Sequence, residues 1–213
     1  MRSDAHISIT RTEVRRGQLT RHAAERLDAG RAFVTTTGLG LPRTWGLSTR
    51  AVLDGFERGL ERARTAPGDQ RLEAAVSEAR AELAARCDTL VERTLPDATL
   101  VALVLAEGKL HVMSVGPGRV YLQRAERPER LTAREEDEAG LLRARPAICS
   151  TPVGPGDLIL AGSVTAFSTS SIAKAMSVLS ADGGTSPSTL ATLLTEPAGR
   201  AGVGAAAIVL RVR

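Results

Sequence analysis

Three short apolar runs follow one another within residues 98–124, with only turn-forming residues between them. The first run, residues 99–106, is rich in Val and Leu and ends at the pair Glu107-Gly108. The second, residues 110–115, alternates apolar with small or polar side chains, which is typical of a strand with one buried face. It ends at Gly116-Pro117-Gly118, where Pro donates no backbone hydrogen bond and Gly permits a positive φ. A third run follows, so the pattern predicts an antiparallel meander on which the rest of the chain packs.

The segments on either side of this meander divide into strands and helices. Alternating or β-branched residues predict strands over residues 5–14, 32–37, 158–161 and 205–212. Apolar residues at every third or fourth position predict helices over residues 47–64, 71–91, 168–179 and 188–194. For residues 17–26, the local pattern does not decide between strand and loop.

The order of these elements is strands, two long helices, more strands, two helices and a final strand. That order favours antiparallel sheets sandwiched between helix pairs, an α+β architecture. A chain of 213 residues can bury a sizeable core, either as one large domain or as two small ones.

The composition narrows the classes of function. The hydrophobic fraction of 43% and the charged fraction of 24% are those of an ordinary globular protein. Aromatic residues make up only 2% and the basic residues are spread along the chain, which argues against nucleic-acid binding. No apolar run approaches the roughly 20 residues that span a bilayer, and the first residues form no apolar signal region. We therefore expect a soluble, cytoplasmic protein with no membrane partner.

Several residues invite a chemical interpretation that their surroundings do not support. The two cysteines, Cys87 and Cys149, lie far apart with no CxxC spacing, so we expect free thiols. The acidic run at residues 135–138 is expected on the solvated face of a segment spanning residues 133–142. Gly38-Leu39-Gly40 follows a strand but lacks the third glycine of a dinucleotide-binding fingerprint. The histidines have no partners at metal-ligand spacing and are expected to be core or surface residues: His6, His22 and His111.

Four segments, spread from the first strands to the last, have sequences that carry a family signal: residues 21–26, 34–40, 155–165 and 203–207. They are similar to the R-x-x-x-E-D, V-x-D-G-x-G-G, P-G-D-x-L-L-L-x-S-D-G-L and D-N-I-T-V motifs of the metal-dependent protein phosphatase 2C (PPM-type) serine/threonine phosphatases. Residues 116–119 also resemble that family's G-D-S-R turn between two strands. The resemblance implies a single domain over residues 1–213, with the family's four-layer α-β-β-α sandwich of antiparallel sheets flanked by helix pairs.

The same resemblance implies that the metal centre is lost. The family hydrolyses phosphoserine and phosphothreonine with water held by two Mg²⁺ or Mn²⁺ ions, which need carboxylate ligands. The positions that match the family's metal-binding Asp residues hold Arg26, Thr37, Ser163 and Val203. Glu25 is retained, but one carboxylate cannot hold two divalent ions. We therefore expect no metal cofactor and no hydrolysis of the family's kind, which defines a pseudophosphatase.

For the vestigial pocket, defined as Arg21, Glu25, Arg26, Thr37, Gly38, Ser163 and Val203, two hypotheses remain open. Arg21 and Arg26 could together bind a phosphate group that the site no longer cleaves, because a guanidinium matches phosphate in bidentate fashion. Alternatively, Arg26 forms a salt bridge with Glu25 or another acid and plugs the cavity.

The resemblance also implies a place in bacterial serine/threonine kinase signalling, with a protein partner such as a phosphoprotein or a kinase. Two other classes stay open: an enzyme, either a phosphatase with rebuilt metal ligands or an unrelated hydrolase, and a scaffold without phosphate recognition. Ser163 at the end of an expected strand does not settle the hydrolase alternative, since its surroundings do not read G-x-S-x-G.

Overall fold

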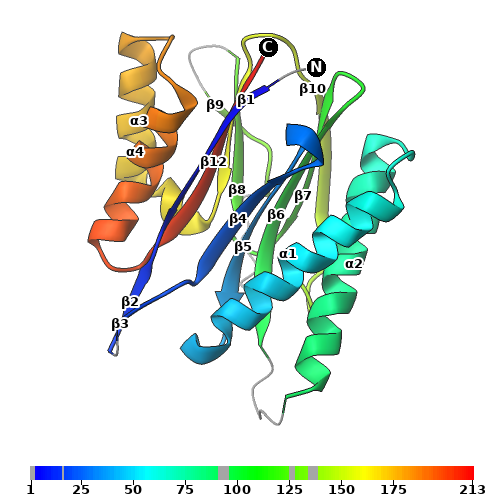
Figure 1. Cartoon of the computed structure of the whole chain (residues 1–213). Helices are drawn as coiled ribbons and strands as arrows, with labels where there is room; N and C mark the ends of the chain where they lie inside the picture. Colours follow the sequence, from blue (N-terminus) through cyan, green and yellow to red (C-terminus); the bar gives the residue numbers. More distant parts are fainter. Residues whose placement is uncertain (1–2, 16, 91–95, 125–127, 134–138) are drawn as a thin grey trace.

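Two five-stranded antiparallel sheets pack face to face, and a pair of helices covers the outer face of each (Figure 1). The computed structural model describes residues 3–15, 17–90, 96–124, 128–133 and 139–213. This is the α-β-β-α sandwich that the sequence predicts, and every strand pair in it is antiparallel.

The strands are distributed over the two large sheets and one small hairpin. Sheet I has the order β10-β7-β6-β5-β4, with bounds Ala147–Pro152, Lys109–Val115, Asp97–Ala106, Ala32–Leu39 and His22–Leu27. Sheet II has the order β1-β12-β11-β8-β9, with bounds Ser3–Thr10, Ala205–Val212, Leu158–Gly162, Arg119–Gln123 and Pro128–Arg130. The hairpin consists of β2 and β3, with bounds Thr12–Val14 and Gly17–Leu19.

The helices complete the outer layers. Sheet I is covered by α1 and α2, and sheet II by α3 and α4 (Figure 1). The four helices have the bounds Trp45–Arg62, Gly68–Asp88, Thr169–Ala181 and Pro187–Arg200. Three short 3₁₀ turns, η1, η2 and η3, have the bounds Asp28–Gly30, Pro42–Thr44 and Val164–Phe167. None of the helices in the described residues is long and apolar enough to cross a lipid bilayer.

Apolar side chains fill all three spaces between the four layers. Phe56 packs between sheet I and its helices, Phe33 between the two sheets, and Leu190 between sheet II and its helices. Because neighbouring residues of a strand point to opposite faces, the inner strands of both sheets bury both of their faces. This explains why residues 99–106 read as a nearly continuous apolar run.

The close contact between α1 and α2 depends on two glycines of α1. A Cβ on Gly55 would lie 2.6 Å from Cα of Ala79, and one on Gly59 would lie 2.5 Å from Cα of Ala75. The two helices therefore pack backbone against backbone, and they form one rigid cover over sheet I.

The predicted meander over residues 98–124 is wrong in one respect. Strands β6 and β7 form a hairpin in sheet I, but β8 belongs to sheet II, where it pairs with β11 and β9. The change of sheet occurs at Gly116-Pro117-Gly118, where Gly116 has a φ of +78° and a Cβ on it would lie 2.6 Å from Cγ2 of Thr99. The two glycines give the chain room to cross between the sheets, so the turn that looked like a hairpin is a crossover.

Other boundaries also differ from the prediction. Residues 17–26, whose sequence pattern does not decide between strand and loop, contain β3 and the larger part of β4. The last helix continues to Arg200 through Pro197, whereas the prediction ended it at residue 194. Strand β10 was not predicted, because it is an edge strand with mostly exposed side chains and shows little apolar periodicity. The acidic run at residues 135–138 lies outside the described residues.

Candidate functional site

A buried histidine occupies the end of the sandwich where three of the family-like segments meet. His22 is the first residue of β4 and lies directly across from Thr37 on β5. Its Nδ1 lies 3.0 Å from the hydroxyl of Thr37, and its Nε2 lies 3.3 Å from the carbonyl oxygen of Val203, which precedes β12. The ring is 1% exposed, so these two contacts satisfy both of its nitrogens away from solvent.

The surroundings of His22 fix its charge and its tautomer. Burial lowers its pKa to about 4, against a smaller raising effect of the hydrogen bond to Val203 and a further lowering by the charge of Arg21. The ring is therefore neutral at pH 7. Since a carbonyl oxygen can only accept, Nε2 carries the proton and donates it to Val203, and Nδ1 accepts a hydrogen bond from Thr37.

Arg21 precedes this histidine in the chain, and its side chain contacts Gly38 and the ring of Trp45. Its Nε donates to the carbonyl oxygen of Gly38 at 3.3 Å, and its guanidinium carbon lies 5.1 Å from the ring centroid of Trp45. Gly38 donates its own N–H to the carbonyl of Arg21 at 2.8 Å. Gly38 has no room for a side chain, because a Cβ would lie 2.8 Å from Cα of Trp45. Burial lowers the pKa of Arg21, whose charge the Trp45 ring stabilises.

Ser163 lies at the same end of the sandwich, where its hydroxyl contacts the backbone of β12. It follows the last residue of β11, and its hydroxyl accepts a hydrogen bond from the backbone N–H of Ala206 at 3.1 Å. It also lies 3.0 Å from the hydroxyl of Thr165. Val203 is 44% exposed, and its carbonyl accepts a second hydrogen bond from the hydroxyl of Thr12 at 2.9 Å. Five of the predicted pocket residues thus lie at one end of the sandwich, and their polar groups already have partners: Arg21, Thr37, Gly38, Ser163 and Val203.

Glu25 and Arg26 do not join them. In the ladder between β4 and β5, Glu25 pairs with Val34 and Arg26 with Phe33, three and four residues from the pair formed by His22 and Thr37. At about 3.3 Å per residue, this separation is roughly 10 to 13 Å. His22, and not Arg26, therefore occupies the position beside Thr37.

The proposed salt bridge between Glu25 and Arg26 is also wrong. Glu25 faces α1, where one of its oxygens lies 3.9 Å from Arg50, and burial raises its pKa. Arg26 packs over Gly30 in η1, at the opposite end of β4. The charged plug of the prediction is replaced by a neutral histidine that links Thr37 to Val203.

The residues at this end do not fit a two-metal centre. Mg²⁺ and Mn²⁺ prefer carboxylate oxygens in a near-octahedral arrangement. Around His22 the groups are a neutral imidazole, two hydroxyls and a carbonyl, each engaged in a hydrogen bond within the protein, and the one buried carboxylate described at this end, Asp97, cannot alone hold two divalent ions. Among the described residues, no group of three or more His, Cys, Asp or Glu side chains is placed to hold a metal ion.

One buried acid, Asp97, begins β6 at this end of sheet I, and it was not among the predicted pocket residues. It is 4% exposed, and its Oδ1 accepts hydrogen bonds from the backbone N–H groups of Ala98 at 2.8 Å and Leu142 at 3.1 Å. A Cβ on Gly140 would lie 2.5 Å from the same oxygen. Through Oδ1, Asp97 holds the segment around residue 141 against β6, while its Oδ2 is buried without a hydrogen-bond partner among the described residues.

The element order, the two-sheet sandwich and the position of the site define the fold as protein phosphatase 2C-like. The PPM serine/threonine phosphatase MsPP of Mycobacterium smegmatis is 19% identical, with a TM-score of 0.76 over 99% of this chain and 98% of that one. The catalytic domain of the phosphatase PstP, solved with two manganese ions, is 18% identical, with a TM-score of 0.81 over 99% of both chains. PppA, described as a key regulatory component of the T6SS in Pseudomonas aeruginosa, is 17% identical, with a TM-score of 0.75 over 100% of this chain and 97% of that one.

Sequence comparisons add no closer relationship. No family model matches the chain, and no curated protein matches it. Likeness at these identities establishes the fold, so what the site does must be argued from its own residues.

Proposed function

We propose that residues 1–213 form one catalytically inactive, cytoplasmic protein phosphatase 2C-like domain that acts by binding protein in bacterial serine/threonine kinase signalling. The observation that carries the proposal is the neutral His22 held between Thr37 and Val203, two of the positions that match the family's metal-binding Asp residues. A divalent ion at this position would have to break both hydrogen bonds of the ring and lie among hydroxyl and carbonyl groups. Without carboxylates to offset the loss of hydration, such a cation is strongly disfavoured.

The surface beside this site supports a binding role. Leu19, Leu41 and Val203 are large apolar side chains that are 37%, 39% and 44% exposed. A groove of about 620 Å³ is lined there by Val14, Arg15, Leu19, Pro42 and Arg43. A lining that combines apolar side chains with two arginines suits a protein segment that carries both apolar and acidic side chains.

A signalling role also agrees with that of PppA, a regulatory component with a similar fold. For this chain the role of a regulator rests on analogy of fold, and the partner, a phosphoprotein or a kinase, is part of the proposal.

The test is hydrolysis of p-nitrophenyl phosphate and of a phosphothreonine peptide with Mn²⁺, with the PstP catalytic domain as the positive control. We expect turnover no higher than in buffer, and no saturable heat on titration with micromolar Mn²⁺. Metal-dependent turnover that Thr37→Ala abolishes would overturn the proposal in favour of an active phosphatase with non-standard ligands.

A second measurement separates a phosphate reader from a scaffold. Of the two arginines, Arg21 supports the reader hypothesis better, because it contacts Gly38 and Trp45 next to His22. A phosphothreonine peptide that binds wild type but not Arg21→Ala would identify a reader. Equal binding of the phosphorylated and unphosphorylated peptides would leave a scaffold, whose partner a pull-down from the native host would identify.

A further inference from the structure

An arginine-lined cavity of about 560 Å³ lies at the opposite end of β4 from His22. Arg26, Arg31 and Arg64 line it, together with Ser3 and the residues of η1. These arginines come from three different places: the end of β4, the loop that leads into β5, and the segment after α1. The fold therefore gathers three cations from separate elements around one hollow.

The cavity carries an excess of positive charge. The acid among its described lining residues, Asp28, is already paired with Arg71, whose Nη2 lies 3.1 Å from Oδ2 of Asp28 and whose side chain is 10% exposed. Arg64 lies 3.7 Å from Glu61, but both side chains are about 75% exposed, so water screens this pair. Within the described part of the chain, neither Arg26 nor Arg31 makes an ion pair.

The local backbone holds these arginines in position. The guanidinium of Arg26 lies over Gly30, where a Cβ would come within 2.8 Å of its Cζ. Gly30 has a φ of +83°, and the two residues before it, Asp28 and Ala29, have φ values of 49° and 50°. Two successive non-glycine residues in the left-handed region are costly, and such strain persists where the surrounding structure enforces it.

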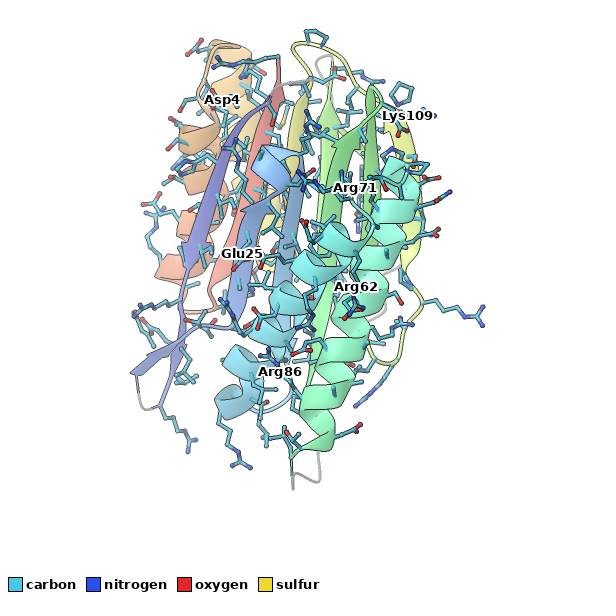
Figure 2. All side chains as sticks on the ribbon, turned by 45° about the vertical axis from the view of Figure 1, so that its right-hand side comes forward. Asp4, Glu25, Arg62, Arg71, Arg86 and Lys109 are labelled. Carbon is cyan, nitrogen blue, oxygen red and sulfur yellow. The ribbon has the colours of Figure 1, made fainter. Side chains whose placement is uncertain are left out.

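Arg31 is anchored through its backbone. Its N–H donates to the carbonyl of Asp28 at 3.0 Å, and its carbonyl accepts from Leu105 of β6 at 2.7 Å. Figure 2 shows Arg71 close to this turn, far from Arg86 at the other end of the helix pair. The backbone positions of Arg26 and Arg31 are thus fixed beside the cavity, and both side chains are exposed and accessible to an anion.

We propose that this cavity binds the phosphate groups of a small, multiply charged ligand. Guanidinium forks match phosphate oxygens in bidentate pairs, and three cations suit more than one phosphate charge. The volume exceeds that of a single phosphate and lies within the range of small-molecule sites. The described lining residues include no aromatic side chain, which favours a compact pyrophosphate or sugar phosphate over a nucleotide that needs a stacking surface. The site is independent of the state of His22.

The test is calorimetric titration of the full chain with inorganic phosphate and with pyrophosphate at low ionic strength. We expect saturable binding, tighter for pyrophosphate, that weakens as salt is raised. Arg26→Gln and Arg31→Gln should each weaken it by about tenfold, as expected for loss of a charged hydrogen bond.

Two arginines supply matched controls. Arg62 pairs with Glu78 on the outer surface of α1 and α2, two residues from Arg64, and Arg200 pairs with Glu196 on α4. Arg62→Gln and Arg200→Gln should change the affinity less than twofold. No saturable heat at millimolar pyrophosphate, or equal weakening by all four substitutions, would overturn the proposal.

A phosphoserine peptide and its unphosphorylated form complete the experiment by identifying the source of the phosphate. Tighter binding of pyrophosphate than of the phosphopeptide, with both lost in Arg31→Gln, supports the small ligand. A phosphopeptide that binds at least as tightly as pyrophosphate and depends on Arg31 would overturn the small-ligand assignment and place a phosphoprotein in the cavity.

Discussion

The two ends of β4 differ in whether their polar and charged groups are buried and hydrogen-bonded. At the His22 end, every polar atom that the ring presents meets a partner, and the ring is neutral and closed off from water. At the Arg26 end, arginines outnumber acids among the described residues that line an open cavity. The lining includes Asp28 and Ala29, whose backbone is in the left-handed region. Satisfied, buried polar groups stabilise a fold, whereas uncompensated charge around a hollow is available to a ligand.

This contrast concerns the two proposals made for this chain. The end that gathers Arg21, Thr37 and Val203 holds a neutral, hydrogen-bonded histidine. The other end holds Arg26 with two further arginines around a cavity. Because one fold can host many functions, each end has to be tested through its own residues.

The largest expected effect comes from charging the closed end. His22→Asp places a carboxylate where Val203 offers only a carbonyl oxygen, so the charge is buried without a cation. We expect a loss of about 3 to 5 kcal/mol in the free energy of unfolding, measured by urea denaturation. His6→Asp, on an exposed histidine of β1, is the control and should change stability by no more than about 0.5 kcal/mol. Equal losses in the two variants would show that the buried environment of His22 does not determine the effect of a charge at this position.

A somewhat smaller effect follows from the pKa of His22. In the unfolded chain an ordinary histidine titrates near 6.5, while in the folded protein the pKa of His22 is about 4. Between these values the unfolded state binds more protons, so stability falls as the pH drops from about 6.5 to about 4 and is not lost further through this group below that. The whole effect is about 3 kcal/mol, at 1.4 kcal/mol per pH unit.

The measurement is the free energy of unfolding of wild type and His22→Gln between pH 7.5 and 4, reported as their difference. Taking the difference removes the titration of carboxylates that the two proteins share, including Glu25, whose pKa burial raises. The same slope in both proteins would mean that His22 is accessible to protons in the folded state.

The layers of the fold could be predicted because each one leaves a local pattern. The apolar stripe of α2 and the apolar run of β6 can be read without knowing what they pack against. The crossover at Gly116-Pro117-Gly118 could not, since a tight hairpin and a change of sheet demand the same residues. Which one occurs is decided by the packing of β8 against β11.

The site was misplaced because its geometry depends on strand register. Matching the letters of a motif put Arg26 beside Thr37, but register is set by the turn between β4 and β5. That turn is Asp28-Ala29-Gly30-Arg31, which pairs Leu27 with Ala32 and therefore His22 with Thr37. The turn-forming residues Asp28 and Gly30 were visible in the sequence, and counting outward from them would have found His22.

The smallest expected effect is the coupling between the two ends. Thr37→Val removes the hydroxyl that donates to Nδ1 of His22 and should cost about 1 kcal/mol, because a buried acceptor loses its partner. Arg31→Gln should leave stability within about 0.5 kcal/mol, since its exposed side chain has no ion pair among the described residues. The two positions are separated by most of the length of β5, so their effects should add within about 0.5 kcal/mol in the double variant. In a separate titration with pyrophosphate, Thr37→Val should leave the affinity unchanged. A coupling energy above about 1 kcal/mol between the two substitutions, or a changed affinity in Thr37→Val, would mean that β5 transmits the state of one end to the other. The centre around His22 would then regulate the cavity.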